Sequence, residues 1–358
     1  MIWEKNIKEH TSFDNFAILY RTKAQSRAFE DSLRRKNIPY RIFGGLSFYQ
    51  RKEVKDIISY LRLIVNQKDD EAFKRIINLP ARGIGETTLA RLKIAANEHE
   101  TSLWEAAINS ANWGLKINKP TIEKLLAFCD LIKSYKIISL EKDAFELVEN
   151  VARTSGIIKF LGEDKTPEGV MRYENVQELL NGIKNFVEEQ QQIENGNPSI
   201  EYFLEDIALI TEADRNQKDD RPKVNLMTMH AAKGLEFDVV FLPGWEEGLF
   251  PHQKSLEEKG DFALEEERRL AYVGITRAKK EAYLSFAMKR AYHGDWMDAL
   301  PSRFINEIPE DSVEKNEIGL NENDDFEFNQ DNSIEFDEEY RSPGWDRYKK
   351  NKMLKWKK

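Results

Sequence analysis

Short apolar runs alternate with helical patterns in the first part of the chain. Residues 16–20 form an apolar run that suits a buried strand, and residues 40–43 predict a second strand, which Gly44 ends. Residues 53–65 then follow a helical period, with one apolar face made of Val54, Ile57, Ile58, Leu61 and Ile64. This alternation of strand and helix predicts an α/β architecture with a largely parallel sheet.

The pattern changes near residue 66. Residues 67–222 are dominated by helical periodicity, and the alternation of strand and helix resumes at Val224 and continues to about residue 309. The simplest architecture is one discontinuous α/β domain, residues 1–66 and 223–309, with an α-helical domain, residues 67–222, inserted into it. Residues 310–358 are an acidic and then basic tail, for which we expect disorder.

Composition narrows the class of protein. The chain has 358 residues, of which 41% are hydrophobic and 33% charged, as in soluble globular proteins. No apolar stretch approaches the roughly 20 residues of a membrane span, and the first residues lack a secretory pattern. Cys129 is the only cysteine, which excludes an internal disulfide and a cysteine-based zinc site. We therefore expect a cytoplasmic protein.

The net charge of −9 is unevenly distributed. Residues 310–340 contain 13 acidic residues and one lysine, which gives −12, and residues 341–358 contain eight basic residues and one aspartate, which gives +7. The remaining body, residues 1–309, therefore carries −4. A nearly balanced body argues against a protein that coats nucleic acid, so any contact with DNA must be local.

Two segments of the second half deliver polar residues from apolar strands or helices. Residues 224–241 are Val-Asn-Leu-Met-Thr-Met-His-Ala-Ala-Lys-Gly-Leu-Glu-Phe-Asp-Val-Val-Phe, and residues 265–278 are Glu-Glu-Glu-Arg-Arg-Leu-Ala-Tyr-Val-Gly-Ile-Thr-Arg-Ala. Such an arrangement is typical of a nucleotide-binding interface. The chain contains no Gly-x-x-x-x-Gly-Lys-Ser/Thr, the loop that cradles phosphates in P-loop proteins.

These two segments resemble motifs V and VI of superfamily 1 DNA helicases of the UvrD/PcrA/Rep type. Residues 20–27, Tyr-Arg-Thr-Lys-Ala-Gln-Ser-Arg, match a further family segment, and residues 44–56 match the segment after it. The resemblance implies the C-terminal half of an ATP-dependent helicase. That half would be a RecA-like P-loop NTPase-type domain without the Walker A motif (domain 2A) and an inserted all-α domain (domain 2B). ATP and Mg²⁺ would then be bound mainly by an N-terminal half, and this chain alone would be inactive.

The resemblance implies a catalytic role for Arg277. In phosphoryl transfer, a guanidinium from a neighbouring domain stabilises the negative charge that spreads over the transferred group. Glu236 and Gly234 would contact the ribose or phosphate region of the same nucleotide. The alternatives are a surface ion pair of Arg277 with Glu266 or Glu267, and a solvated turn carboxylate at Glu236.

The resemblance also implies residues that bind single-stranded DNA. Thr228 and His230 belong to the first segment, where His230 would link the nucleotide state to the grip on DNA; a structural histidine is the alternative. His252 closes Gly-Leu-Phe-Pro-His, which resembles a family loop that carries a DNA-contacting histidine.

A Gly-Ile-Gly turn in residues 78–91 opens a predicted helix. Glycines let a backbone approach a phosphate, and helix N-terminal amides can receive it. The family's similar turn touches the duplex ahead of the fork, and a plain tight turn is the alternative. Thr87 is the predicted N-cap. The residues implied to bind duplex DNA are Arg82, Gly83, Ile84, Gly85 and Thr87.

We therefore expect an ATP-dependent DNA helicase that moves 3′ to 5′ and unwinds duplex DNA in repair or replication. Its partners would be single-stranded DNA, single-strand/duplex junctions, its own N-terminal helicase domains and repair proteins. The alternative is a non-enzymatic DNA-binding or partner-binding protein that uses a decayed helicase module. A transition-state arginine favours the enzyme, because a binding module has no need of one.

Overall fold

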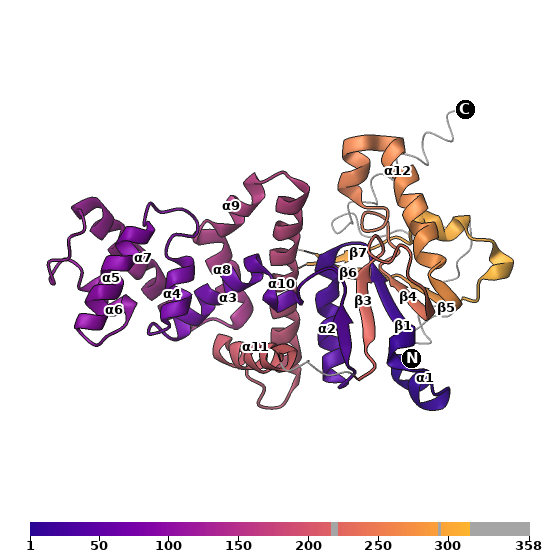
Figure 1. The fold of residues 1–358 in the computed structure, drawn as a ribbon, viewed down its shortest axis with the longest axis horizontal. Helices are drawn as coiled ribbons and strands as arrows, with labels where there is room; N and C mark the ends of the chain where they lie inside the picture. Colours follow the sequence, from indigo (N-terminus) through magenta and orange to yellow (C-terminus); the bar gives the residue numbers. More distant parts are fainter. Residues whose placement is uncertain (216–220, 293–294, 316–358) are drawn as a thin grey trace. The chain divides into compact units, whose positions relative to one another are not determined.

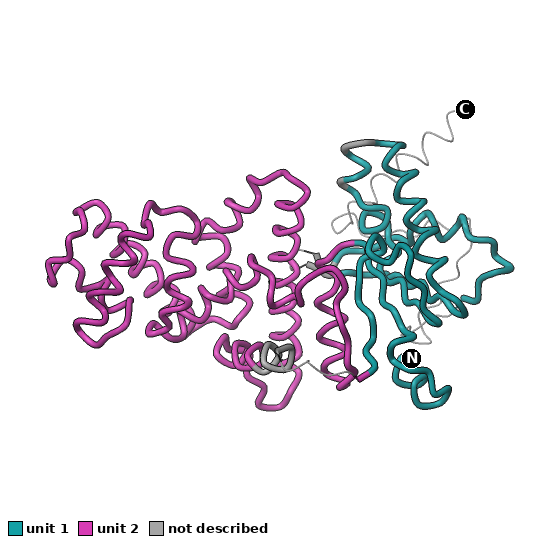
Figure 2. The backbone as a smooth tube through the Cα atoms, in the orientation of Figure 1, with its two compact units in different colours: residues 1–21, 222–358 teal, residues 22–221 magenta. Residues whose placement is uncertain are grey.

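The computed structural model describes residues 1–215, 221–292 and 295–315 (Figure 1). It contains two compact units, residues 1–21 with 222–358, and residues 22–221 (Figure 2). Most of the predicted acidic and basic tail, residues 316–358, lies outside the described residues. Among the helices that are described, none is both long and apolar enough to cross a membrane.

A parallel sheet with flanking helices confirms the predicted α/β fold. Its strand order is β2-β3-β1-β4-β5. β1 pairs in parallel with β3 and with β4, and β4 pairs in parallel with β5. The strands are β1 (Phe16–Tyr20), β2 (Tyr40–Ile42), β3 (Val224–Thr228), β4 (Phe237–Pro243) and β5 (Ala278–Ser285).

The strands of the first unit form because their apolar residues are buried. All five residues of β1 are buried, as expected for a central strand of a parallel sheet that is covered on both faces. The core of this unit combines side chains of β1, β3 and β4 with Trp245, Phe250 and Phe304. Two further strands, β6 (Lys289–Tyr292) and β7 (Asp295–Asp298), pair antiparallel in a separate hairpin.

The helices of the first unit are α1 (Ile2–Lys8) and the long α12 (Gln253–Ile275). Gly260 interrupts α12 with φ 55° and ψ −132°, which is not helical. α12 therefore consists of two arms that run in different directions (Figure 1). Short 3-10 helices cover residues 13–15, 303–307 and 310–312.

The second unit is a helical assembly around its own core. The apolar face predicted within residues 53–65 is buried in this core, which confirms that helix. The helices are α2 (Ser26–Arg35), α3 (Lys52–Val65), α4 (Asp70–Ile76), α5 (Glu86–Glu98), α6 (Leu103–Ile108), α7 (Lys119–Ile138), α8 (Ala144–Thr154), α9 (Ile157–Glu163), α10 (Pro167–Gln192) and α11 (Ile200–Arg215). Shorter 3-10 turns cover residues 23–25 and 48–50.

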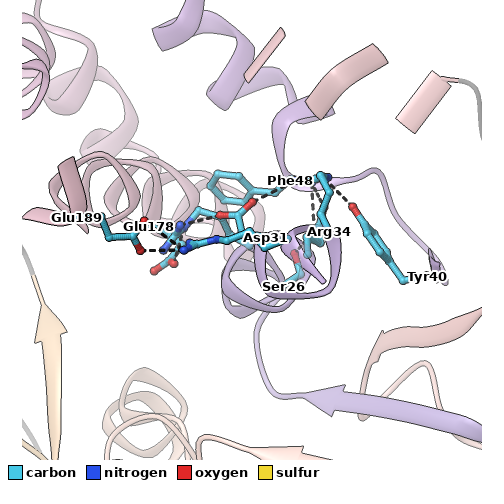
Figure 3. Close-up of polar contacts among 10 residues, drawn as sticks. Ser26, Asp31, Arg34, Tyr40, Phe48, Glu178 and Glu189 are labelled. Carbon is cyan, nitrogen blue, oxygen red and sulfur yellow. Dashed lines mark hydrogen bonds and ion pairs between the residues drawn. The ribbon is translucent and has the colours of Figure 1, made fainter. Parts of the chain in front are cut away.

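Polar contacts join α2 to α10 inside the second unit (Figure 3). Arg27 donates to Glu178 of α10 at 2.8 Å and to Asp31 at 2.9 Å, and its side chain is 8% exposed. A Cβ at Gly182 of α10 would lie 2.8 Å from the Arg27 guanidinium, so any larger residue there would have to displace this side chain. These contacts explain why residues 22–66 cluster with the helical unit. Their assignment to the α/β domain, which the sequence pattern favours, stays a prediction.

Glu30 is a buried carboxylate in the same region. Its oxygens accept hydrogen bonds from Ser26 Oγ at 2.7 Å and from the Phe48 backbone N–H at 3.0 Å. Burial raises the pKa of Glu30 to about 7, and these two hydrogen bonds oppose the shift. The Glu30 side chain therefore links the start of α2 to the turn before α3, although burying its ionised form is unfavourable.

Candidate functional site

The predicted site residues of the first unit lie at the two opposite edges of the parallel sheet. Gly234 and Glu236 directly precede β4, and Arg277 directly precedes β5, so all three lie where strands begin. Thr228 is the last residue of β3 and His230 follows it, so these two lie where strands end. The sequence segment 224–241 therefore runs from one edge of the sheet to the other.

Arg277 is held by neutral acceptors. Its Nε donates to the carbonyl of Val273 at 3.0 Å, its Nη1 to the carbonyl of Leu235 at 3.0 Å, and its Nη2 to Thr276 Oγ1 at 3.1 Å. In the described part of the chain, Arg277 forms no ion pair within 4.0 Å, so the structure does not contain the predicted alternative. The guanidinium is half-buried and keeps its charge available for an external anion.

The turn before β4 lies beside Arg277. Gly234 has φ +88°, a left-handed conformation that favours glycine, and a Cβ there would meet no atom within 4 Å. The constraint at Gly234 is therefore conformational rather than steric. Glu236 is exposed, and the Phe237 N–H donates to the Arg277 carbonyl at 2.9 Å. These contacts bring the two predicted nucleotide-binding segments together.

Thr228 and His230 are placed by the end of β3. The Met229 N–H donates to the carbonyl of Tyr20 at 2.9 Å, and Thr228 Oγ1 accepts the Ala231 N–H at 3.3 Å, which closes a turn after the strand. His230 is exposed on this turn. Desolvation and then the positive charge of Arg21 lower the pKa of His230, while Glu267 opposes the shift.

Arg21 and Glu267 belong to the same edge, although sequence analysis gave neither a role there. The guanidinium of Arg21 contacts the Glu267 carboxylate at 2.6 Å (Nη2 to Oε1) and 2.9 Å (Nε to Oε2). Glu267 Oε2 also accepts the backbone N–H of His252 at 3.2 Å. Both residues lie in segments that resemble the helicase family, and this was the only signal that could have identified them.

In the second unit, Asn78 organises the Gly-Ile-Gly turn. Its Oδ1 accepts the backbone N–H groups of Arg82 at 2.7 Å and Ile84 at 3.2 Å. Gly83 has φ +74°, and a Cβ there would lie 2.9 Å from Lys124 Nζ of α7. Gly83, Gly85 and Thr87 are exposed, whereas Ile84 is buried. Ile84 therefore anchors the turn in the core.

One expectation about this turn needs correction, and the role of Arg82 in binding DNA stays a prediction. Gly85 is the N-cap of α5, and Thr87 is the second residue inside the helix, so the predicted N-cap at Thr87 is wrong. The Arg82 guanidinium faces the protein. It donates to the carbonyls of Ile76 and Leu79, both at 3.0 Å, and to the Tyr60 hydroxyl at 2.7 Å. Because the last carbonyls of α4 lack helical partners, this cation stabilises the end of that helix.

Within the described ranges, no group of three or more histidine, cysteine, aspartate or glutamate side chains could hold a metal ion. The donor set of the first unit suits a nucleotide instead. Arg277 offers charge to a phosphate, and the exposed turn at Gly234 and Glu236 offers backbone and a carboxylate acceptor. A guanidinium and an exposed turn of this kind are groups that can bind the phosphates and ribose of a nucleotide.

Comparison with known proteins gives the family. The model of the UvrD-like helicase C-terminal domain matches residues 2–289. The ATP-dependent DNA helicase PcrA of Staphylococcus aureus (strain MRSA252) is 38% identical over 315 residues, which are 88% of this chain and 42% of that protein. DNA helicase II of Haemophilus influenzae is 41% identical over 307 residues, which are 84% of this chain and 41% of the relative.

DNA helicase II of Rickettsia typhi is 40% identical over 297 residues, which are 83% of this chain and 43% of that protein. This chain thus spans less than half the length of these relatives. The matched region includes β1, the turn before β4 and Arg277, which are the parts that place the candidate site. The chain belongs to the UvrD-like helicase C-terminal domain family.

Proposed function

We propose that this chain is the second motor half of an ATP-dependent DNA helicase that moves 3′ to 5′ and unwinds duplex DNA in repair or replication. The observation that carries the proposal is the Arg277 guanidinium, fixed by three neutral acceptors beside the turn at Gly234 and Glu236. The names of the relatives, ATP-dependent DNA helicase PcrA and DNA helicase II, support it.

The nucleotide-binding role follows from the chemistry of this edge. ATP would be bound mainly by N-terminal helicase domains of the same protein, and Mg²⁺ bound with it would neutralise part of the phosphate charge. Arg277 would contact the transferred phosphoryl group, where a planar guanidinium can pair with two oxygens at once. Glu236 would accept a hydrogen bond from the ribose. The fixed position of Arg277 means that little reorganisation is needed when the charge develops.

The DNA-binding role belongs to the opposite edge of the sheet and to the second unit. Thr228, His230 and His252 would contact single-stranded DNA where the strands end. The exposed backbone at Gly83 and Gly85, together with Thr87, would contact duplex DNA at a junction. Since backbone amides bind phosphates without reading bases, this contact would have no sequence preference.

The choice between an enzyme and a binding module rests on Arg277. A binding module that uses a decayed helicase fold would have no need of a guanidinium kept free of carboxylates, so the enzyme is the better account. Further partners would be repair proteins. The proposed compartment is the cytoplasm, in keeping with a single, buried cysteine.

Strand-separation assays test this proposal. In the protein that carries this chain together with its N-terminal helicase domains, ATP should drive unwinding of a duplex with a 3′ single-stranded tail. A duplex with only a 5′ tail should remain paired, and so should the 3′-tailed duplex without ATP. Unwinding that does not require ATP, or DNA binding with no unwinding of either substrate, would contradict the proposal.

A further inference from the structure

The Glu267 carboxylate lies where three segments of the first unit meet. It accepts hydrogen bonds from two nitrogen atoms of Arg21, the residue that directly follows β1, and from the backbone N–H of His252, the N-cap of α12. The Glu267 side chain is 6% exposed and that of Arg21 is 17% exposed. The three contacts are therefore largely shielded from water, where a charge-assisted hydrogen bond constrains geometry most strongly.

Glu267 also fixes the reversal of α12. His252 and Glu267 are 15 residues apart and in contact at 3.2 Å. In a continuous helix, residues this far apart would be separated by about 22 Å. The non-helical Gly260 lets the second arm fold back along the first (Figure 1), and the contact with the His252 N–H joins the two arms at their open end.

Arg21, which is bound to Glu267, follows the strand next to the one that His230 follows. The carbonyl of Tyr20, one residue before Arg21, accepts the Met229 N–H, one residue before His230. Arg21 and His230 therefore follow the ends of neighbouring strands, within one residue of the same level. After desolvation, the positive charge of Arg21 is the second cause that lowers the pKa of the His230 imidazole. A single carboxylate thus touches both the loop of His252 and the cation beside His230.

We infer that Glu267 is a positioning residue for DNA binding, which fixes the His252 loop and the Arg21 guanidinium relative to His230. The inference rests on the proposed contact of both histidines with single-stranded DNA. Glu267 itself is buried and negative, so it does not contact phosphates. Its effect on DNA must come through the groups that it holds.

Glu266 provides a matched control. It is the neighbouring residue on the same arm of α12, but its carboxylate is exposed and pairs with Arg269, one turn along the helix. Glu266→Gln and Glu267→Gln remove the same charge, so the general attraction of the protein for phosphates rises equally in both. Any difference between the two variants in DNA affinity reports the contacts of Glu267.

Histidine NMR tests the inference. The chain has five histidines, so ring signals of histidine-labelled protein can be assigned by substitution. An oligothymidylate of about ten nucleotides, within the range of single-strand sites, is titrated into the parent and both variants. In the parent, the signals of His230 and His252 should move. Glu267→Gln should shift both ring signals before DNA is added and weaken binding about tenfold relative to Glu266→Gln.

The possible outcomes separate the inference from the proposed function. If the ring signals of His230 and His252 in the parent do not shift when the oligonucleotide is added, the proposed DNA contact at this edge is wrong. If the parent binds through them and Glu267→Gln binds as Glu266→Gln does, the proposed function stands and the inference is wrong.

A double variant covers the case in which Glu267→Gln unfolds because the largely shielded charge of Arg21 loses its carboxylate partner. In Arg21→Gln with Glu267→Gln no such charge remains, and the inference still predicts weak binding with a folded spectrum. Loss of affinity only in proportion to the unfolded fraction would show a purely structural role and overturn the inference.

Discussion

Arg277 donates a 3.0 Å hydrogen bond to the carbonyl of Leu235, which lies 42 residues earlier in the chain. This bond joins the turn that precedes β4 to the residue that precedes β5, at the edge of the sheet where both strands begin. The remaining Arg277 acceptors, Val273 and Thr276, are also neutral. The cation is therefore oriented without being neutralised, which is the condition for stabilising charge on a transferred phosphoryl group.

The chain alone should show no meaningful DNA-stimulated ATP hydrolysis. It contains no phosphate-cradling Gly-x-x-x-x-Gly-Lys-Ser/Thr, so Arg277 would have no bound phosphate to stabilise. The check is a steady-state ATPase assay with single-stranded DNA, using protein purified from cells whose own helicases are removed. A turnover of about one per second or faster, typical of enzymes, would contradict this expectation.

Gly83→Glu should weaken binding to a single-strand/duplex junction. Gly83 has φ +74°, so any side chain at this position costs about 1–2 kcal/mol of backbone strain. Gly83→Ala carries the same strain without the charge and serves as the control. The glutamate should reduce junction affinity well below that of the alanine variant, because its carboxylate would repel the backbone phosphates. Equal affinities of the two variants would show that the turn does not contact DNA.

Arg82→Met should destabilise the second unit rather than remove a DNA contact. The substitution leaves the carbonyls of Ile76 and Leu79 without their guanidinium donor and removes a cation 5.1 Å from the Phe128 ring. A loss of about 1–3 kcal/mol in the free energy of unfolding is expected for such hydrogen bonds. Denaturant unfolding measures it. If Arg82→Met is as stable as the parent but binds the junction much more weakly, Arg82 binds a phosphate of the DNA instead.

Glu30 should make stability depend on pH. Because burial raises its folded-state pKa to about 7, above the value in the unfolded chain, the folded state holds the proton more tightly. Stability contributed by this proton is present at low pH and lost as pH rises from about 4.5 to 7, by at most about 1.4 kcal/mol per pH unit. Glu30→Gln should flatten this part of the profile. Other buried carboxyl groups affect parent and variant alike. If the free energy of unfolding falls equally steeply with pH in both proteins, the raised pKa of Glu30 is contradicted.

Several parts of the fold could be predicted because they depend on local patterns. All residues of the apolar run 16–20 are buried in strand β1. The apolar face predicted within residues 53–65 is buried in the core of the second unit. Arg277 could be proposed as a site residue because its surrounding segment resembles a known family, and its role stays a prediction. In contrast, Arg21 and Glu267 meet across 246 residues, and nothing in either local pattern encodes that distance.

The direction of a polar side chain was harder to predict. Arg82 lies in a turn that can present it to a phosphate, but the carbonyls of Ile76 and Ile77 at the end of α4 attract the same cation. The N-cap was misplaced for a related reason. Threonine is a common cap, yet the turn at Gly83 starts α5 one residue beyond Gly85. For Arg82, the contacts with the end of α4 decided the direction of the side chain.

The proposed role of Arg277 in the transition state of ATP hydrolysis can be tested by substituting this arginine. In the protein that carries this chain with its N-terminal helicase domains, kcat and oligothymidylate affinity are measured for Arg277→Ala, Arg277→Lys and Arg269→Ala. Arg269 is an exposed arginine of α12 that pairs with Glu266, so it controls for the loss of a charge.

Arg277→Ala should lower kcat by about 10³-fold or more with nearly unchanged DNA affinity. Arg277→Lys should not restore kcat, since lysine lacks the planar fork, and Arg269→Ala should behave as the parent. An equal loss of DNA binding in Arg277→Ala, or a kcat close to that of Arg269→Ala, would show that Arg277 does not act on the transition state.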